Sequence, residues 1–350
     1  MSRRQPRTDE HAARRAGRGA ILAALSVAAT TAIVAAQTKP SPRSYTPPKT
    51  AWGEPDLRGT YTSDNFIGVP FERPAQYGDR QMLTDAEFEA KEKANEEQVA
   101  KDLSEKPESK FEEDEAANNA PRHWLERGTK LSHATSLVID PPNGRLPALT
   151  PAGQARAALG RARFFRQNDA AEFHSYYDRC ITRGVISSIL PAIYGNGTRI
   201  LQGPGYVVIQ NEMIHEDRVI PTGSSAPRLG KNIHLYMGDP RGHWEANTLV
   251  VDSTNFTDKV GVGGGGQPSR NLHLIEKFTR TAQDTIHYEF TVDDPDTYAA
   301  KWTAALDLTG KPGYEIYEYA CHEGNYGLRN MLSASRADDR ATQSSPRLQQ

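Results

Sequence analysis

The sequence lacks the short motifs by which many enzymes and metalloproteins are recognised. It contains no His-Glu-x-x-His, no Cys-x-x-Cys and no regular loop of carboxylates, so no common metal-binding motif is present. It also contains no Gly-x-Ser-x-Gly, and the glycine-rich run at 261–266 lacks the Gly-Lys-Ser/Thr ending of a phosphate loop. A serine-hydrolase motif and a nucleotide site are therefore unsupported, and we predict no metal and no cofactor.

Cysteine is scarce: the chain has two, Cys180 and Cys321. In an oxidising compartment two cysteines most simply form one disulfide bond, which we predict here. Two buried free thiols, or a reactive Cys321, are the alternatives.

Long hydrophobic runs are limited to one, at 20–36, which is shorter than the roughly 20 apolar residues of a membrane-spanning helix. Six arginines precede it, and Val34, Ala35 and Ala36 supply the small residues that a signal peptidase needs. We predict a signal peptide over 1–36, membrane contact only during export, and a periplasmic or secreted location. The alternative is an uncleaved N-terminal anchor.

Basic clusters are absent from the rest of the chain. Removal of 1–36 changes the formal net charge from -2 to -6, because it removes six arginines and two acidic residues. Thirteen acidic residues against five lysines between 85 and 115 contribute -8, so the remainder is close to neutral. The absence of a basic patch argues against a nucleic-acid partner.

Composition divides the mature chain into three parts. A Pro- and Ser-rich linker is expected at 37–55, a single domain at 56–336 and a disordered tail at 337–350. Within the domain, Thr84 and Glu87 match a capping box, which predicts a solvated helix to about residue 103 inside an acidic insertion at 84–119. Further helices are expected at 150–160 and at about 323–335.

The second half of the chain is rich in short segments typical of β-strands. They contain β-branched and aromatic residues and are separated by turn residues, at 206–212, 213–220, 232–237, 248–252, 272–280, 285–292, 301–308 and 314–320. The connections are too short for the helices of parallel βαβ units. We therefore predict a mainly β fold, an antiparallel calycin- or lipocalin-like barrel with peripheral helices and a C-terminal helix.

Alternation within two of these segments indicates which side chains face inward. The more apolar face of 272–280 carries Glu276 and Arg280, and the apolar face of 285–292 carries Tyr288. A polar and aromatic interior of this kind could bind a small molecule. Alternatively, Glu276 and Arg280 form a structural ion pair at the rim of the barrel.

Two short runs concentrate polar side chains. At 211–218 an extended chain would place His215 and Asp217 on one face, and at 317–326 Cys321, His322 and Glu323 stand together before Tyr326. We predict that His215 and His322 transfer protons, with Asp217 and Glu323 orienting them. Glu276, Arg280, Tyr288 and Tyr326 would bind the substrate. Alternatively, His215 and Asp217 are a surface pair, and His322 and Glu323 are metal ligands or cap the last helix.

Several motifs together resemble a large family of exported bacterial proteins. These motifs are Gly205-Tyr-Val-Val-Ile, Glu212-Met-Ile-His215, Trp244-Glu-x-x-Thr-Leu-Val-Val-Asp252, Asn255-Phe-Thr, Thr291-Val-Asp-Asp-Pro295 and Glu318-Tyr-Ala-Cys-His-Glu-Gly-Asn-Tyr326. The resemblance covers 52–336 and implies export rather than a particular activity. The chain departs from the family at His243, at the turn 246–247 and at 222–226, where an Asp-Gly-Arg-x-His run is replaced. If that run belonged to a site, the activity is altered here.

These observations predict an exported enzyme with acid/base chemistry, of the lyase, isomerase or hydratase type, acting on a small apolar or aromatic molecule. Such chemistry needs positioned proton donors and acceptors and no nucleotide. The alternative is a non-catalytic periplasmic binding protein for a hydrophobic ligand. A third hypothesis is an envelope protein whose acidic arm at 85–119 binds a partner.

Overall fold

A computed structural model describes residues 45–104, 125–164, 169–223, 227–259, 261–263 and 267–344. They belong to one compact unit, Ser44–Gln350. The predicted signal peptide, the start of the linker, the acidic residues 105–119 and the last six residues of the predicted tail lie outside the described residues.

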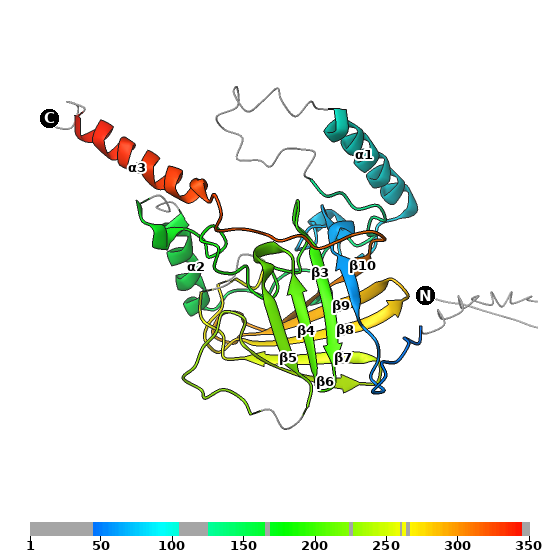
Figure 1. Cartoon of the computed structure of the whole chain (residues 1–350). Coiled ribbons are helices and arrows are strands. Elements are labelled where there is room, and N and C mark those ends of the chain that lie inside the picture. Colours follow the sequence, from blue (N-terminus) through cyan, green and yellow to red (C-terminus); the bar gives the residue numbers. More distant parts are fainter. Residues whose placement is uncertain are drawn as a thin grey trace, which may run out of the picture. The chain divides into compact units, whose positions relative to one another are not determined.

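The described chain is mainly β, as predicted, and its strands form one antiparallel sheet (Figure 1). The strands are β1 (Gly59–Thr62), β2 (Val138–Asp140), β3 (Gly197–Gly203), β4 (Tyr206–Asn211), β5 (Asp217–Pro221), β6 (Asp239–Glu245), β7 (Thr248–Thr254), β8 (His273–Ala282), β9 (Thr285–Asp293) and β10 (Trp302–Gly310). Their order is β5-β4-β3-β1-β10-β9-β8-β7-β6, with β2 paired to β10.

Helices and short 3-10 turns lie outside the sheet. The α-helices are α1 (Asp85–Ser104), α2 (Pro151–Phe164) and α3 (Tyr326–Ser344). The 3-10 turns are η1 (Asp64–Phe66), η2 (Ala75–Tyr77), η5 (Ala171–Phe173) and η6 (Met213–His215).

The predicted closure into a calycin-like barrel is not confirmed. Among the described residues no ladder joins β5 to β6, the two ends of the strand order. The two strands nevertheless pack together, because a Cβ placed on Gly242 of β6 would lie 3.1 Å from side-chain atoms of Ile220 and Thr222. The sheet is thus open in its hydrogen bonding while its end strands touch through side chains.

Strand prediction failed at two of the eight segments. Residues 232–237 form a loop, held by the Asn255 amide nitrogen, which donates to the carbonyls of Gly230 and Ile233 at 3.0 Å each. Residues 314–320 are also irregular. A third segment, 213–220, is only partly extended, because Ile214 (φ 61°) and His215 (φ 41°) adopt the left-handed region before β5 begins.

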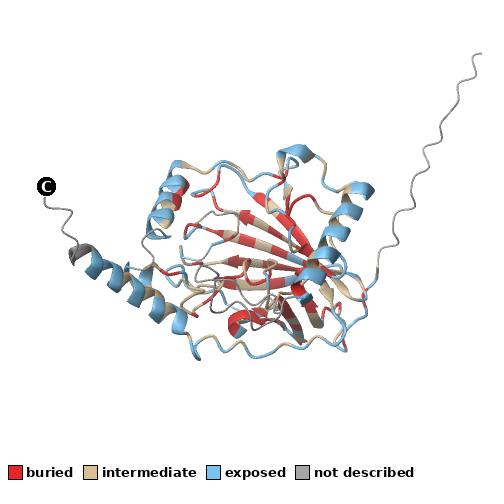
Figure 2. Cartoon of the chain, turned by 90° about the horizontal axis from the view of Figure 1, so that it is seen from above, coloured by how far each residue is buried: buried red, intermediate tan, exposed pale blue. Residues whose placement is uncertain are grey.

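The core lies on the predicted inner faces of β8 and β9. Phe278, Tyr288 and Phe290 have no exposed surface, and successive ring centres lie 4.8 and 5.6 Å apart. Trp302 of β10 continues this row, 5.8 Å from Phe290. Figure 2 shows buried and partly exposed residues alternating along the strands, as the two-residue period of a sheet requires.

A buried ion pair crosses the interior between distant strands. Nη2 of Arg218, on β5, lies 2.6 Å from Oε2 of Glu276, on β8, and donates to the Ser253 hydroxyl of β7 at 2.7 Å. The Tyr288 hydroxyl donates to the other oxygen of Glu276 at 3.0 Å. Because Glu276 is fully buried and Arg218 is 4 % exposed, the pair links β5 to β7, β8 and β9 away from water.

Arg280 is not the partner of Glu276. Its guanidinium donates to the backbone carbonyls of Asp56, at 2.9 Å, and Gln283. The reason is its position at the end of β8, where the register shifts between Arg280 and Ala282 and the strand leaves the buried interior.

The starts of α1 and α2 follow the predicted capping residues, whereas α3 begins three residues after the predicted start. Glu87 accepts from the Thr84 amide at 2.8 Å, and the Thr84 hydroxyl accepts from the Glu87 amide at 3.3 Å, which completes the capping box of α1. Hydrogen bonds from Arg80 and Thr84 lower the pKa of Glu87 to about 2. At α2, the Gly153 amide donates to the Thr150 hydroxyl at 3.0 Å.

The structure differs from the prediction at both ends of the domain. Helix α3 continues to Ser344, so residues 337–344 are helical rather than disordered. Arginine and alanine favour helix there, and no glycine or proline interrupts the run. The described part of the linker folds back on itself, with the Thr50 amide donating to Glu54 and the Asp56 amide to Pro48, each at 2.8 Å.

We predict that breaking the buried pair destabilises the protein strongly. Glu276→Gln should lower the free energy of unfolding by about 3–5 kcal/mol, because the Arg218 charge remains buried without its counter-charge. Urea unfolding measures this. The matched control is Glu289→Gln, since Glu289 pairs with Lys277 at 3.2 Å on the outer face of β8 and β9, and its loss should cost less than about 1 kcal/mol. Equal effects of the two variants would contradict the prediction.

We also predict a pH-dependent contribution from His287. It lies opposite Asp307 on β9 and β10, and their 2.7 Å hydrogen bond raises the pKa of His287. The protonated ring therefore stabilises the fold below the unfolded pKa of about 6.5, and the effect disappears as pH rises through the raised folded pKa. His287→Gln should lose less than about 1 kcal/mol at pH 5.5 and nothing at pH 9, because the pair is partly exposed. A loss that is independent of pH would refute this.

Candidate functional site

The segment that follows β10 passes over the ends of β3 and β4 without joining the sheet. We call residues 314–325 the strap. Its first fastening is the Tyr314 hydroxyl, which donates to the carboxylate of Glu212 just beyond β4. Glu212 also accepts from the amides of Gly197, at 3.2 Å, and Tyr317, at 3.5 Å. These side-chain bonds replace the ladder that was expected at 314–320, which is why the strand prediction failed.

The second fastening is the disulfide between Cys180 and Cys321, which confirms the predicted pair. Its Cα atoms are 5.6 Å apart and its cysteines are separated by 141 residues in the chain. Next to it, the Asn325 side chain donates to the Asp178 carbonyl at 3.1 Å and lies 3.4 Å from Sγ of Cys180. The disulfide therefore fixes the strap to the loop 175–180 and is consistent with an exported protein.

A cluster of phenols lies between this loop and the strap. The Tyr177 hydroxyl is 2.9 Å from that of Tyr319 and 3.3 Å from that of Tyr194. Arg183 lies over the Tyr177 ring, 5.4 Å from its centre. Burial raises the pKa of Tyr177 and of Tyr319, so both phenols stay protonated in alkaline solution as well as at neutral pH.

Sequence reasoning missed this cluster, although a signal was present. Tyr177 stands three residues before Cys180, and Tyr319 two residues before Cys321. A disulfide between these cysteines brings the two tyrosines near each other, so the contact between Tyr177 and Tyr319 could have been predicted from the disulfide.

The imidazole ring of His215 contacts the backbone of the strap. Nδ1 of His215 lies 2.9 Å from the carbonyl oxygen of Tyr319. Because a carbonyl only accepts, Nδ1 must carry the proton, and Nε2 of the neutral ring is left as an acceptor. The left-handed conformation at residues 214 and 215 turns this side chain toward the strap.

The carboxyl group next to His215 is less exposed than the imidazole. Glu216 accepts from the Thr182 hydroxyl at 2.8 and 2.6 Å, and burial raises its pKa. With a raised pKa, more of Glu216 is protonated at mildly acidic pH than of an ordinary carboxyl group, so it can act there as a general acid.

The other predicted site residues lie in separate places. Asp217 is exposed at the first position of β5, and His322 and Glu323 are exposed on the strap. Tyr326 is 66 % exposed at the start of α3. Glu276 and Tyr288 belong to the buried core. Arg280 lines a surface pocket beside Tyr61 and Lys311. The structure thus places His322 and Glu323 on the strap and bonds His215 to it. Of the predicted substrate-binding residues, Tyr326 directly follows the strap, whereas Glu276, Tyr288 and Arg280 lie elsewhere.

A groove of about 750 Å³ opens between the loop and the strap. It is lined by Tyr177, Asp178, Glu318, Tyr319, Ala320, Cys321, Glu323, Gly324 and Asn325. Three acidic residues and two tyrosines therefore line one space whose walls are joined by a disulfide, although the Asp178 carboxylate also accepts from the Ser175 amide and hydroxyl. Such a surface suits a small ligand that carries a positive charge or several hydrogen-bond donors.

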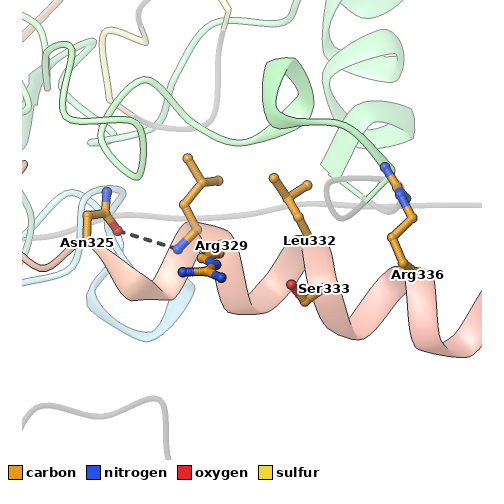
Figure 3. Close-up of a pocket in the computed structure, with 6 residues that line it drawn as sticks. Asn325, Arg329, Leu332, Ser333 and Arg336 are labelled. Atoms are coloured by element: carbon orange, nitrogen blue, oxygen red, sulfur yellow. Dashed lines mark hydrogen bonds between the residues drawn. The ribbon is translucent and has the colours of Figure 1, made fainter.

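A shallower groove of about 430 Å³ runs along α3 (Figure 3). Leu332 and Arg336 extend from the same side of the helix, and Arg336 donates to the Asp169 carbonyl at 2.6 Å. The groove is lined by residues of α3 and the adjoining Asn325 alone, so it offers a ligand fewer converging groups than the groove beside the strap.

Neither a metal cluster nor a membrane span is found in the described part of the chain. Within residues 45–104, 125–164, 169–223, 227–259, 261–263 and 267–344, no three His, Cys, Asp or Glu side chains gather so that they could hold a metal ion. None of the helices there combines the length and apolar character needed to cross a bilayer.

Comparison with protein-family models, with curated proteins and with solved structures gave no match to this chain. The function of the chain is therefore inferred from the geometry of the groove.

We predict that removing the disulfide destabilises the protein and loosens the strap. Cys180→Ser with Cys321→Ser should lower the free energy of unfolding by about 4–5 kcal/mol, because the bond closes a loop of 141 residues. Urea unfolding measures the loss, and hydrogen exchange should quicken in 314–325 while β8 and β9 stay protected. Unchanged stability and unchanged exchange in the strap would show that the other fastenings suffice.

Proposed function

We propose that this chain is an exported protein that binds a small cationic or hydrogen-bond-donating molecule in the groove between loop 175–180 and the strap. One observation carries the proposal: three acidic residues and two tyrosines line a space whose walls are linked covalently. The N-terminal sequence and the disulfide support export.

The ligand class follows from the chemistry of the walls. Glu318 and Glu323 can accept charge-assisted hydrogen bonds from an ammonium group. The rings of Tyr177 and Tyr319 offer faces for cation-π contact and apolar area for a hydrocarbon portion. Walls that are already fixed to each other lose little entropy on binding, which favours affinity.

A second candidate function is acid/base catalysis, of the lyase, isomerase or hydratase type, at His215, which contacts the strap but does not line the groove. The observation that favours it is the hydrogen bond from Nδ1 of His215 to the Tyr319 carbonyl, which leaves Nε2 able to accept a proton. In this mechanism His215 is the base, and the carboxyl group of the next residue, Glu216, is the acid. A carrier would retain its ligand unchanged, whereas an enzyme would convert it.

We predict that the groove binds tyramine more tightly than its uncharged analogue 4-ethylphenol. Isothermal titration calorimetry on the mature protein should show at least a tenfold difference, or about 1.4 kcal/mol. Glu323→Gln should weaken tyramine binding about three- to tenfold, since one charge-assisted contact is lost.

The matched control is Glu315→Gln, which removes the same charge from an exposed strap residue that does not line the groove. It should leave the affinity for tyramine unchanged. Equal binding of tyramine and 4-ethylphenol, or equal weakening by the two variants, would exclude the proposed charge recognition. Conversion of a bound ligand that is abolished in His215→Asn would favour the enzyme over the carrier.

A further inference from the structure

A second pocket, of about 340 Å³, lies on the other side of loop 175–180. It is assembled from the end of α2, η5, the loop itself and two later connections. Its lining residues are Arg163, Glu172, Phe173, Tyr176, Arg179, Tyr236 and Lys259. The volume is at the lower end of the range of small-molecule sites, which is enough for a compact one- or two-ring compound.

Aromatic side chains form one side of this pocket. The rings of Tyr176 and Tyr236 are 5.3 Å apart and tilted by 48°, and Phe173 lies nearby on η5. Tyr176 and Tyr236 come from segments 60 residues apart in the chain, so tertiary packing, not local sequence, creates this surface. Their combined faces offer a planar ligand a stacking surface.

Positive charge dominates the rest of the lining. Arg163, Arg179 and Lys259 face a single carboxylate, that of Glu172, so the pocket carries a formal charge of +2. Within the described residues, none of these three cations forms an ion pair with a carboxylate at 4.0 Å or less. Arg179 instead lies over the Tyr176 ring, 5.5 Å from its centre. An anion placed here would relieve the mutual repulsion of the three cations.

The loop contributes a tyrosine and a charged residue to each of the two sites, and the two charges have opposite signs. Tyr176 and Arg179 line this pocket, whereas Tyr177 and Asp178 line the groove beside the strap. The disulfide at Cys180 ends the loop and therefore anchors the wall that the pocket and the groove share. The charge of the pocket selects a ligand of the opposite sign.

We propose that this pocket binds a small planar aromatic anion, with its ring against the Tyr176 and Tyr236 pair and its negative group on Arg179 and Lys259. A guanidinium that already lies over an aromatic ring keeps its edge N–H groups available for a carboxylate. The proposal does not depend on the function proposed for the groove.

The test uses 1-naphthoate as the probe and titrates it into the mature protein by calorimetry. 1-Naphthoate should bind at least tenfold more tightly than its neutral analogue 1-naphthamide, and its affinity should fall with added salt. Arg179→Gln should weaken naphthoate binding about tenfold. Lys301→Gln, which removes a charge from an exposed residue outside the pocket, should leave it unchanged.

Two further measurements distinguish loss of a binding contact from misfolding of the variant. Thermal unfolding shows whether Arg179→Gln is folded, and Lys259→Gln is a second variant that should weaken naphthoate binding in the same way. Equal affinity for naphthoate and naphthamide, or equal behaviour of Arg179→Gln and Lys301→Gln, would overturn the proposal. Inorganic phosphate that binds as tightly as naphthoate would overturn the aromatic part of it.

Discussion

The buried ion pair of Arg218 and Glu276 joins the two ends of the sheet through the protein interior. Arg218 comes from β5, the first strand in the order, and Glu276 from β8, near the opposite end. Since no ladder joins β5 to β6 in the described chain, this contact and the side-chain packing at Gly242 hold the ends together. The arrangement reduces the stability of the fold, because Nε and Nη1 of Arg218 are buried without a hydrogen-bond partner among the described residues. A local polar interaction thus replaces the backbone closure of a true barrel.

The strap depends on a similar substitution of side chains for backbone pairing. Tyr314 bonds to Glu212, Tyr319 bonds to both Tyr177 and His215, and Cys321 is joined to Cys180. A segment fastened at separate points can pass over the sheet edge and leave open space beside it. The same fastenings therefore create the groove and position its phenols.

Sequence patterns predicted the parts of the fold that repeat over short distances. Alternation placed Glu276 and Tyr288 on inner faces, the capping box placed the start of α1, and two cysteines implied one disulfide. The same local reasoning offered Arg280 as one possible ion-pair partner of Glu276, because both lie on one face of one strand. The true partner, Arg218, is 58 residues earlier and reaches Glu276 only through the curvature of the sheet. The strap has a strand-like sequence, and its irregular path is fixed by Glu212, which lies 102 residues before Tyr314 and 105 before Tyr317. Pairings of this range depend on tertiary geometry and leave no local periodicity.

The disulfide also has a mechanical consequence. It closes a covalent ring from Cys180 to Cys321 that contains every strand from β3 to β10. Tension applied to the two chain ends passes through the sulfur atoms and does not stretch these strands. The ring therefore withholds on the order of 450 Å of contour length from extension, for its 141-residue separation. A single proteolytic cut within it would leave both pieces attached to each other.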